Sequence, residues 1–76
     1  MPHVNNRMYP RRTDEQKQAL TEKVIEAFGV ALDIPPEWLT VAIEEVERDD
    51  WHADVVGPEI RAKAHLLTKH PEYLDD

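Results

Sequence analysis

The spacing of apolar residues changes twice within the first 46 positions, and this change most constrains the fold. The segments 4–9 and 39–46 follow a two-residue pattern: Val4 and Met8 fall on one side of the first, and Leu39, Val41 and Ile43 fall on one side of the second. Steps of three and four separate the apolar residues between these segments. Alternation is typical of a half-buried strand, and steps of three and four are typical of an amphipathic helix. Parallel neighbouring strands need a long crossover, usually a helix. The order therefore predicts a parallel β-α-β unit.

Clear start and stop signals bound the expected first helix. The segment Thr13-Asp14-Glu15-Gln16 has the form of a capping box, with Thr13 as N-cap and Gln16 at the third helical position. Pro35-Pro36 predicts the end of the helix, because proline lacks a donor and biases the preceding residue toward extended conformations. A short turn around Trp38 is expected to follow. The apolar stripe consists of Leu20, Val24, Ile25, Ala27, Phe28, Ala31 and Leu32.

The last third of the chain predicts a second helix. An acidic loop from Glu47 to Asp54 carries Trp51, and Gly57-Pro58-Glu59 offers a helix start with proline at its first position. His70-Pro71 would end this helix, and the residues after it, to Asp76, are expected to form a loose acidic tail. The expected fold class is thus α/β: one β-α-β unit with a second, C-terminal helix, in a single domain of residues 1–76.

The chain is too short to build a large core of its own. It has 76 residues and no cysteine. A domain of this length buries only about 60% of its unfolded surface, and no disulfide can supply the missing stability. Two strands and two helices also leave a sheet edge open to pairing. We therefore expect an oligomer, a homodimer in the first place, with a hexamer as the alternative assembly.

Charge and composition narrow the range of partners. With 9 basic and 16 acidic residues, the net charge of -7 repels nucleic acid and anionic membranes. No apolar run approaches the roughly 20 residues that cross a bilayer, and the first residues lack the pattern of a secretory signal. The sequence thus predicts a cytoplasmic protein that binds neither nucleic acid nor membrane.

Several kinds of chemistry lack the residues that they need. The chain has no serine and no cysteine for nucleophilic hydrolysis, and no glycine-rich loop for nucleotide phosphates. Its four histidines do not follow a zinc spacing, and the acidic residues between Glu44 and Asp54 lack the pattern of a calcium loop. We expect neither a metal nor a cofactor.

Met1-Pro2 offers a different kind of chemistry. Removal of Met1 would turn Pro2 into a secondary amine at the end of the chain, which can act as a base. Within a chain, by contrast, the proline nitrogen is an amide without a proton. The alternative is that Pro2 merely begins an edge strand, where its missing donor does no harm.

These features occur together in a known order. Pro2 before a short strand, Arg11-Arg12 leading into Thr13-Asp14-Glu15-Gln16-Lys17, then Leu32-Asp33-Ile34-Pro35 and a second strand resemble the tautomerase superfamily over nearly the whole chain. The chain is most similar to the 4-oxalocrotonate tautomerase family. Within that family it resembles the dimeric branch with a C-terminal helix and a tryptophan after the second strand, here Asp50-Trp51. The resemblance implies the tautomerase (MIF-like) fold, assembled as an oligomer.

The resemblance also implies roles for individual residues. It makes Pro2 the general base, and it makes Arg12 the group that binds the substrate carboxylate, with Arg11 as its substitute. It makes Trp51 an aromatic wall of the pocket. By strand parity, Asn6, Met8 and Thr40 are further candidates for lining the pocket.

Two consequences concern the substrate and the base. Thr40 stands where the family has a second arginine, which favours a monocarboxylate such as the enol of phenylpyruvate over a dicarboxylate. A free α-amino group has a pKa of roughly 7.7 to 8.0, and a secondary amine usually a higher one. Apolar Met8 and Trp51 and the Arg12 cation would each lower the pKa of the Pro2 amine toward neutrality.

The predicted function is cofactor-independent keto-enol tautomerisation of a small 2-oxo acid. One alternative on the same fold is a hydratase or dehalogenase of unsaturated acids, in which Glu44 or Glu45 activates water. The other is a non-catalytic oligomeric interaction module whose acidic surface binds a basic protein.

Overall fold

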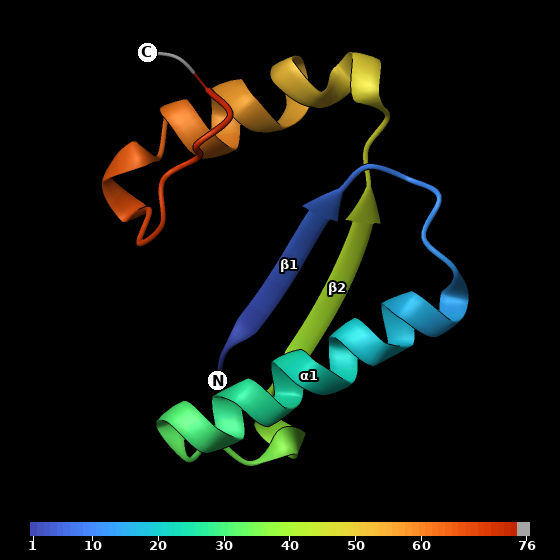
Figure 1. Cartoon of the computed structure of the whole chain (residues 1–76). Helices are drawn as coiled ribbons and strands as arrows, with labels where there is room; N and C mark the ends of the chain where they lie inside the picture. Colours follow the sequence, from blue (N-terminus) through green and yellow to red (C-terminus); the bar gives the residue numbers. More distant parts are fainter. Residues whose placement is uncertain (75–76) are drawn as a thin grey trace. The chain divides into compact units, whose positions relative to one another are not determined.

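The computed structural model describes residues 1–74 and divides the chain into two compact units, which are described one at a time. The first unit, residues 1–45, contains β1 (His3–Met8), α1 (Asp14–Leu32) and β2 (Thr40–Glu45). The second unit starts at Val46 and contains the helical segment η3 (His52–Arg61). The element order, drawn in Figure 1, confirms the predicted β-α-β unit followed by C-terminal helical structure.

β1 and β2 form a two-stranded parallel sheet, and α1 crosses one of its faces (Figure 1). In the register, His3 lies opposite Thr40 and Met8 lies opposite Glu45. β2 is two residues shorter than predicted, whereas β1 has the predicted length but begins and ends one residue earlier. The difference arises because alternation reports which face a side chain occupies, not where the hydrogen-bond ladder ends.

The two faces of this sheet differ in character. Val4, Asn6 and Met8 are half-buried on one face. On the other face, His3 Nδ1 and Thr40 Oγ1 are hydrogen-bonded at 2.6 Å. Next along that face, Asn5 Nδ2 and Arg7 Nε each donate to Glu44 Oε1 at 3.2 Å. The second face is therefore a ladder of polar side chains.

The ends of α1 follow the predicted signals. Thr13 Oγ1 accepts from Gln16 N at 3.0 Å, and Thr13 N donates to Gln16 Oε1 at 2.9 Å, so the capping box is confirmed. At the other end, Asp33 adopts a left-handed conformation with φ 57° and donates its N–H to Gly29 O and Phe28 O. This arrangement satisfies carbonyls of the last turn before the prolines are reached.

The predicted turn around Trp38 is present as the short 3-10 helix η1 (Pro36–Trp38). Trp38 N and Leu39 N donate to Pro35 O and Pro36 O, both at 3.1 Å. The turn delivers the chain directly into β2.

In the second unit, the prediction of a helix start at Gly57-Pro58 is wrong. η3 is a π-helix that begins at His52 and contains Pro58 in its interior. Val55 and Val56 are only 5% and 2% exposed, and their burial keeps the segment helical ahead of the proline. The helix also ends at Arg61 instead of reaching His70, and a 3-10 turn, η4 (Ala64–Leu66), follows. The end of the expected acidic tail, residues 75–76, lies outside the described residues.

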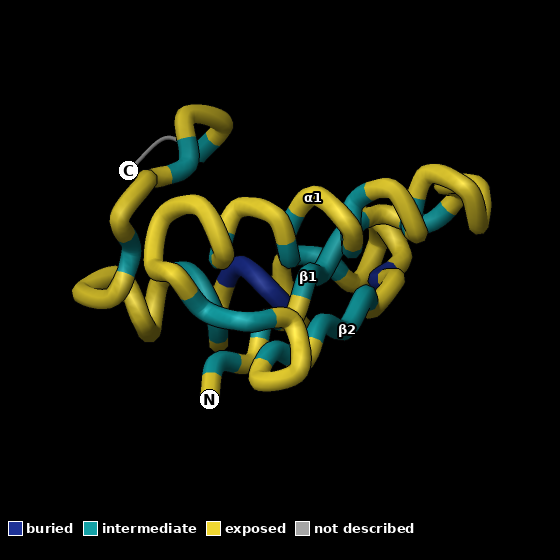
Figure 2. Tube along the Cα trace, turned by 90° about the horizontal axis from the view of Figure 1, so that it is seen from below, coloured by how far each residue is buried: buried dark blue, intermediate teal, exposed yellow. Residues whose placement is uncertain are grey.

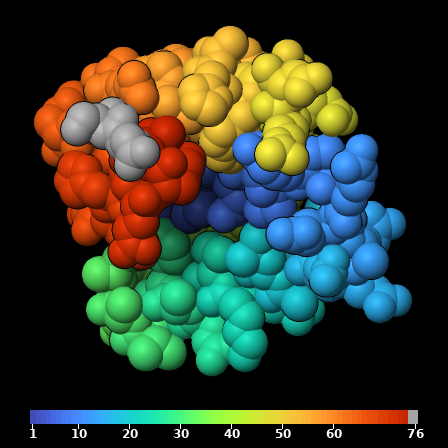
Figure 3. Space-filling model, turned by 45° about the horizontal axis from the view of Figure 1, so that its top comes forward, coloured from blue at the N-terminus to red at the C-terminus, as the bar shows by residue number. Residues whose placement is uncertain are grey.

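The first unit has little core of its own. Val46, Val55 and Val56, the buried apolar residues within 1–74, all belong to the second unit, and no residue of α1 is buried. Figure 2 accordingly draws α1 in yellow and teal along its length, and Figure 3 shows its surface, in cyan to green, open to solvent. Within the stripe, Leu20, Val24, Ile25 and Phe28 are half-buried, and Leu32 is 61% exposed. The apolar stripe of α1 is thus not fully buried within a single chain.

Within residues 1–74, no helix is both long enough and apolar enough to cross a membrane.

Candidate active site

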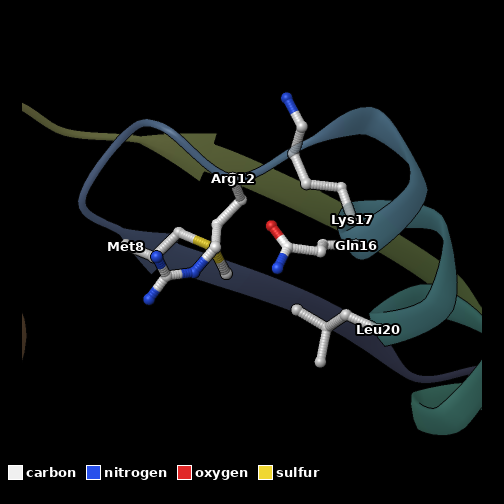
Figure 4. Close-up of a pocket in the computed structure, with 5 residues that line it drawn as sticks. All are labelled: Met8, Arg12, Gln16, Lys17 and Leu20. Carbon is white, nitrogen blue, oxygen red and sulfur yellow. The ribbon is translucent and has the colours of Figure 1, made fainter.

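A pocket of about 250 Å³ lies between the end of β1 and the first turns of α1. β1 ends at Met8, the chain turns, and the capping box then starts α1 beside the strand it has just left. Helical spacing brings positions 16, 17 and 20 toward the same side. The lining residues, drawn in Figure 4, are Met8, Arg12, Gln16, Lys17 and Leu20.

Arg11 and Arg12 take different places although they are neighbours. Both residues are exposed, but Arg12 lines the pocket and Arg11 does not. Arg11 has a φ of 82°, in the left-handed region that residues with a side chain rarely adopt. This conformation lies in the turn that leads from β1 to Arg12.

The apolar and polar parts of the pocket are distinct. Met8 contributes a thioether and Leu20 an isobutyl group, while Arg12 contributes a guanidinium. A guanidinium presents a planar fork of donors that matches the two oxygens of a carboxylate. The pocket is therefore suited to a small carboxylate with an apolar tail.

Lys17 also borders the pocket, but its ammonium has carboxylate neighbours. Lys17 Nζ lies 3.6 Å from Asp14 Oδ1 and 3.5 Å from Glu45 Oε1. In Figure 4 it points away from the Arg12 guanidinium. The ion pair with Glu45 links α1 to β2, so Lys17 helps to hold these two elements together at the edge of the pocket.

Pro2 lies at the other end of β1. Its carbonyl oxygen accepts a hydrogen bond from Thr40 N at 3.2 Å, which fixes it at the start of the sheet. Pro2 and Met8 are six positions apart along extended chain, a span of about 20 Å at 3.3 Å per residue. Pro2 and Arg12 of one chain therefore do not face the same small molecule.

The remaining predicted residues lie away from the pocket or outside its unit. Thr40 is hydrogen-bonded to His3 on the polar face of the sheet, the face opposite Met8. Trp51 belongs to the second unit, where it is half-buried at the start of η3. The structure thus brings together Met8 and Arg12 of the predicted set, and the roles of the predicted site residues stay predictions.

The two carboxylates considered for a hydratase both make ion pairs. Glu44 Oε1 lies 3.2 Å from Arg7 Nε, and Glu45 Oε1 pairs with Lys17. In the part of the chain that the structure describes, no group of three or more His, Asp or Glu side chains is arranged to hold a metal ion.

Sequence reasoning assigned Gln16 only to the capping box and Leu20 only to the apolar stripe, yet both line the pocket. A signal for them was present. Gln16 and Leu20 are four residues apart, so they lie on the same face of α1. The parity of β1 places Met8 on the sheet face that α1 covers.

Comparison with known proteins identifies the family. The family model described as "Tautomerase enzyme" matches residues 2–61. The tautomerase PptA of Enterobacter sp. (strain 638) is 36% identical over 74 residues, which cover 96% of this chain and 97% of that protein. The 2-hydroxymuconate tautomerase of Bacillus subtilis (strain 168) is 44% identical over 57 residues, 75% of this chain and 89% of its own length.

Solved structures agree with the sequence comparison. A structure of the 4-oxalocrotonate tautomerase isozymes from Methylibium petroleiphilum matches with a TM-score of 0.62 and 36% identity, covering 66% of this chain and 81% of the other. YwhB, a homologue of 4-oxalocrotonate tautomerase, matches with the same TM-score and 43% identity, over 74% and 88% of the two chains. The chain therefore belongs to the tautomerase family and is an isomerase with tautomerase function.

Proposed function

We propose that this enzyme interconverts the enol and keto forms of a small 2-oxo acid with a phenylpyruvate-like tail, without a cofactor. The observation that carries the proposal is the pocket in which the Arg12 guanidinium borders the apolar side chains of Met8 and Leu20. A carboxylate and a non-polar tail in one small molecule match these two parts. Residues 1–76 act as one tautomerase domain in this proposal.

The reaction needs one base and one carboxylate-binding group. Arg12 binds the carboxylate and stabilises the charge that develops on the adjacent oxygen. After removal of Met1, the Pro2 nitrogen takes the enol O–H proton, the O–H electron pair forms the carbonyl, and the carbon–carbon double bond takes the proton back from Pro2. One amine thus serves both steps, and Pro2 ends in the neutral form in which it began.

Such a site requires two chains. Because Pro2 and Arg12 of one chain lie at opposite ends of β1, Pro2 of one copy must work with Arg12 of another. A homodimer is the smallest assembly that provides both, and a hexamer provides them too. The apolar stripe of α1, of which no residue is fully buried, and the absence of buried residues in positions 1–45 support this assembly. Trp51 remains the proposed aromatic wall.

A monocarboxylate fits better than a dicarboxylate. Lys17, the second cation at the pocket, pairs with Asp14 and Glu45. Thr40 offers a hydroxyl instead of a charge, and this hydroxyl is hydrogen-bonded to His3. Arg12 is then the cation proposed for a single substrate carboxylate.

The test is ketonisation of phenylpyruvate enol, followed by ultraviolet absorbance, with methionine-free protein and its Pro2→Ala variant. We expect kcat/KM to fall by a factor of about 10² to 10⁴ in the variant, the usual contribution of a general base. Arg11→Ala, which changes a residue outside the pocket, is the control and should retain wild-type kinetics. Equal rates in wild-type protein and Pro2→Ala would exclude Pro2 as the base.

A further inference from the structure

We infer that Gln16 is a second substrate-binding residue, whose side-chain nitrogen donates to the carboxylate held by Arg12. The inference rests on the proposed function and names the partner of Arg12 in the same pocket. Gln16 contributes an amide to a lining that otherwise consists of two cations and two apolar side chains. Three observations carry the inference: the orientation of this amide, its neighbours, and the engagement of Lys17.

The capping box fixes which way the amide faces. Thr13 N carries a hydrogen and lies 2.9 Å from the Gln16 amide, so the atom that it meets must be an acceptor, the oxygen Oε1. The reciprocal bond from Gln16 N to Thr13 Oγ1, at 3.0 Å, holds the same turn. With Oε1 turned to the N-cap, the Nε2 group and its two hydrogens lie on the other side of the amide.

The surroundings of Nε2 are apolar on the protein side. Figure 4 shows the Gln16 amide extending from α1 into the space between the Arg12, Met8 and Leu20 side chains, with its nitrogen turned to the side of Met8 and Leu20. Neither of these two side chains carries a strong acceptor. A substrate carboxylate bound next to Met8 and Leu20 would supply an acceptor for Gln16 Nε2.

Gln16 is also chemically matched to Arg12. A carboxylate has two oxygens and about four lone-pair sites, more than a single guanidinium fork uses. A neutral amide adds a donor without placing a second cation beside the guanidinium, whereas Lys17, the other donor at the pocket, pairs with Glu45. Because Gln16 is held by the capping box, its donor needs little ordering when the ligand binds.

The substitution Gln16→Glu removes the side-chain donor of Gln16 and should leave the fold intact. Glutamate serves equally well in a capping box, and an acidic residue in the first turn is favourable to the helix, so α1 should be retained. The change replaces the Nε2 donor by an anionic oxygen beside the bound carboxylate. We expect KM for phenylpyruvate enol to rise at least about tenfold with a much smaller change in kcat, and the unfolding transition to be unchanged or raised.

Gln18→Glu is the matched control. Gln18 is two residues further along α1, outside the pocket, and bonds Glu22 on the exposed side of the helix. The substitution makes the same change of net charge at nearly the same place. It should leave KM within about twofold of wild type, because repulsion between exposed charges is weak.

Binding of phenylacetate, measured by calorimetry, supplies a readout without turnover. We expect Kd to rise at least about tenfold in Gln16→Glu and to stay near wild type in Gln18→Glu. Wild-type KM and Kd in Gln16→Glu, or no phenylacetate binding by the wild-type protein, would overturn the inference. A further outcome is that the wild-type protein binds phenylacetate without ketonising the enol, and that Gln16→Glu weakens this binding. This result would support the carboxylate site and exclude the proposed reaction.

Discussion

Arg11 holds an uncommon backbone conformation directly before the arginine that lines the pocket. Its φ of 82° is a position that glycine adopts freely and that other residues adopt at a cost of about 1 to 2 kcal/mol. The side chain of Arg11 is exposed and is not among those lining the pocket, so the conformation serves the turn and not a contact of Arg11 with the pocket. Residues with such strain often mark functional sites.

Replacing Arg11 by glycine should therefore help the fold. We expect Arg11→Gly to raise the free energy of unfolding by up to about 1 kcal/mol, since relief of the left-handed strain exceeds the entropy that glycine adds to the unfolded chain. Urea denaturation at a fixed protein concentration measures this, with Arg11→Ala as the control that keeps the strain. A loss of stability in Arg11→Gly relative to Arg11→Ala would show that the turn is not strained.

α1 and η3 show how well local signals define an element. The capping box and the two prolines predicted both ends of α1, because each signal acts through bonds between near neighbours. Gly57-Pro58 misplaced the start of η3, because the burial of Val55 and Val56 extends the helix backward past the proline. That burial is a tertiary effect, and the local sequence does not report it.

The capping box of α1 leads to a prediction about the stability of this helix. Thr13→Ala removes the acceptor for Gln16 N and should lower the free energy of unfolding by about 1 kcal/mol. Thr13→Ser keeps the hydroxyl and should lose much less. Thermal unfolding of both variants, followed by circular dichroism at equal concentration, measures the difference, and equal stability of the two would show that the cap contributes little.

At the scale of the whole molecule, a single chain leaves two features incomplete: the packing of α1 and the proposed active site. α1 carries an apolar stripe without a buried residue, and Pro2 and Arg12 lie at opposite ends of β1. The proposed homodimer would account for both features, because a second copy would cover the stripe and bring its own arginine to the proline. The stability and the activity of this protein should then depend on one assembly.

Subunit complementation tests this assembly. Pro2→Ala and Arg12→Ala should each be nearly inactive alone, because every site then lacks one partner. When equal amounts are unfolded together and refolded as random dimers, half of the dimers are mixed and each mixed dimer has one intact site. We expect about a quarter of the wild-type activity in the enol assay. A mixture no more active than its components would show that the two residues do not meet across chains.

The sequence by itself determined the strand–helix–strand order, the capped start and proline-bounded end of α1, and the residue types available for proton transfer and carboxylate binding. These follow from periodicity and from contacts between neighbours along the chain. Only the tertiary structure decided that Arg12 and not Arg11 lines the pocket, that Gln16 reaches it from α1, and that Pro2 lies a strand length away. Periodicity assigns a side chain to one face of its own element, whereas distances between elements depend on how those elements pack.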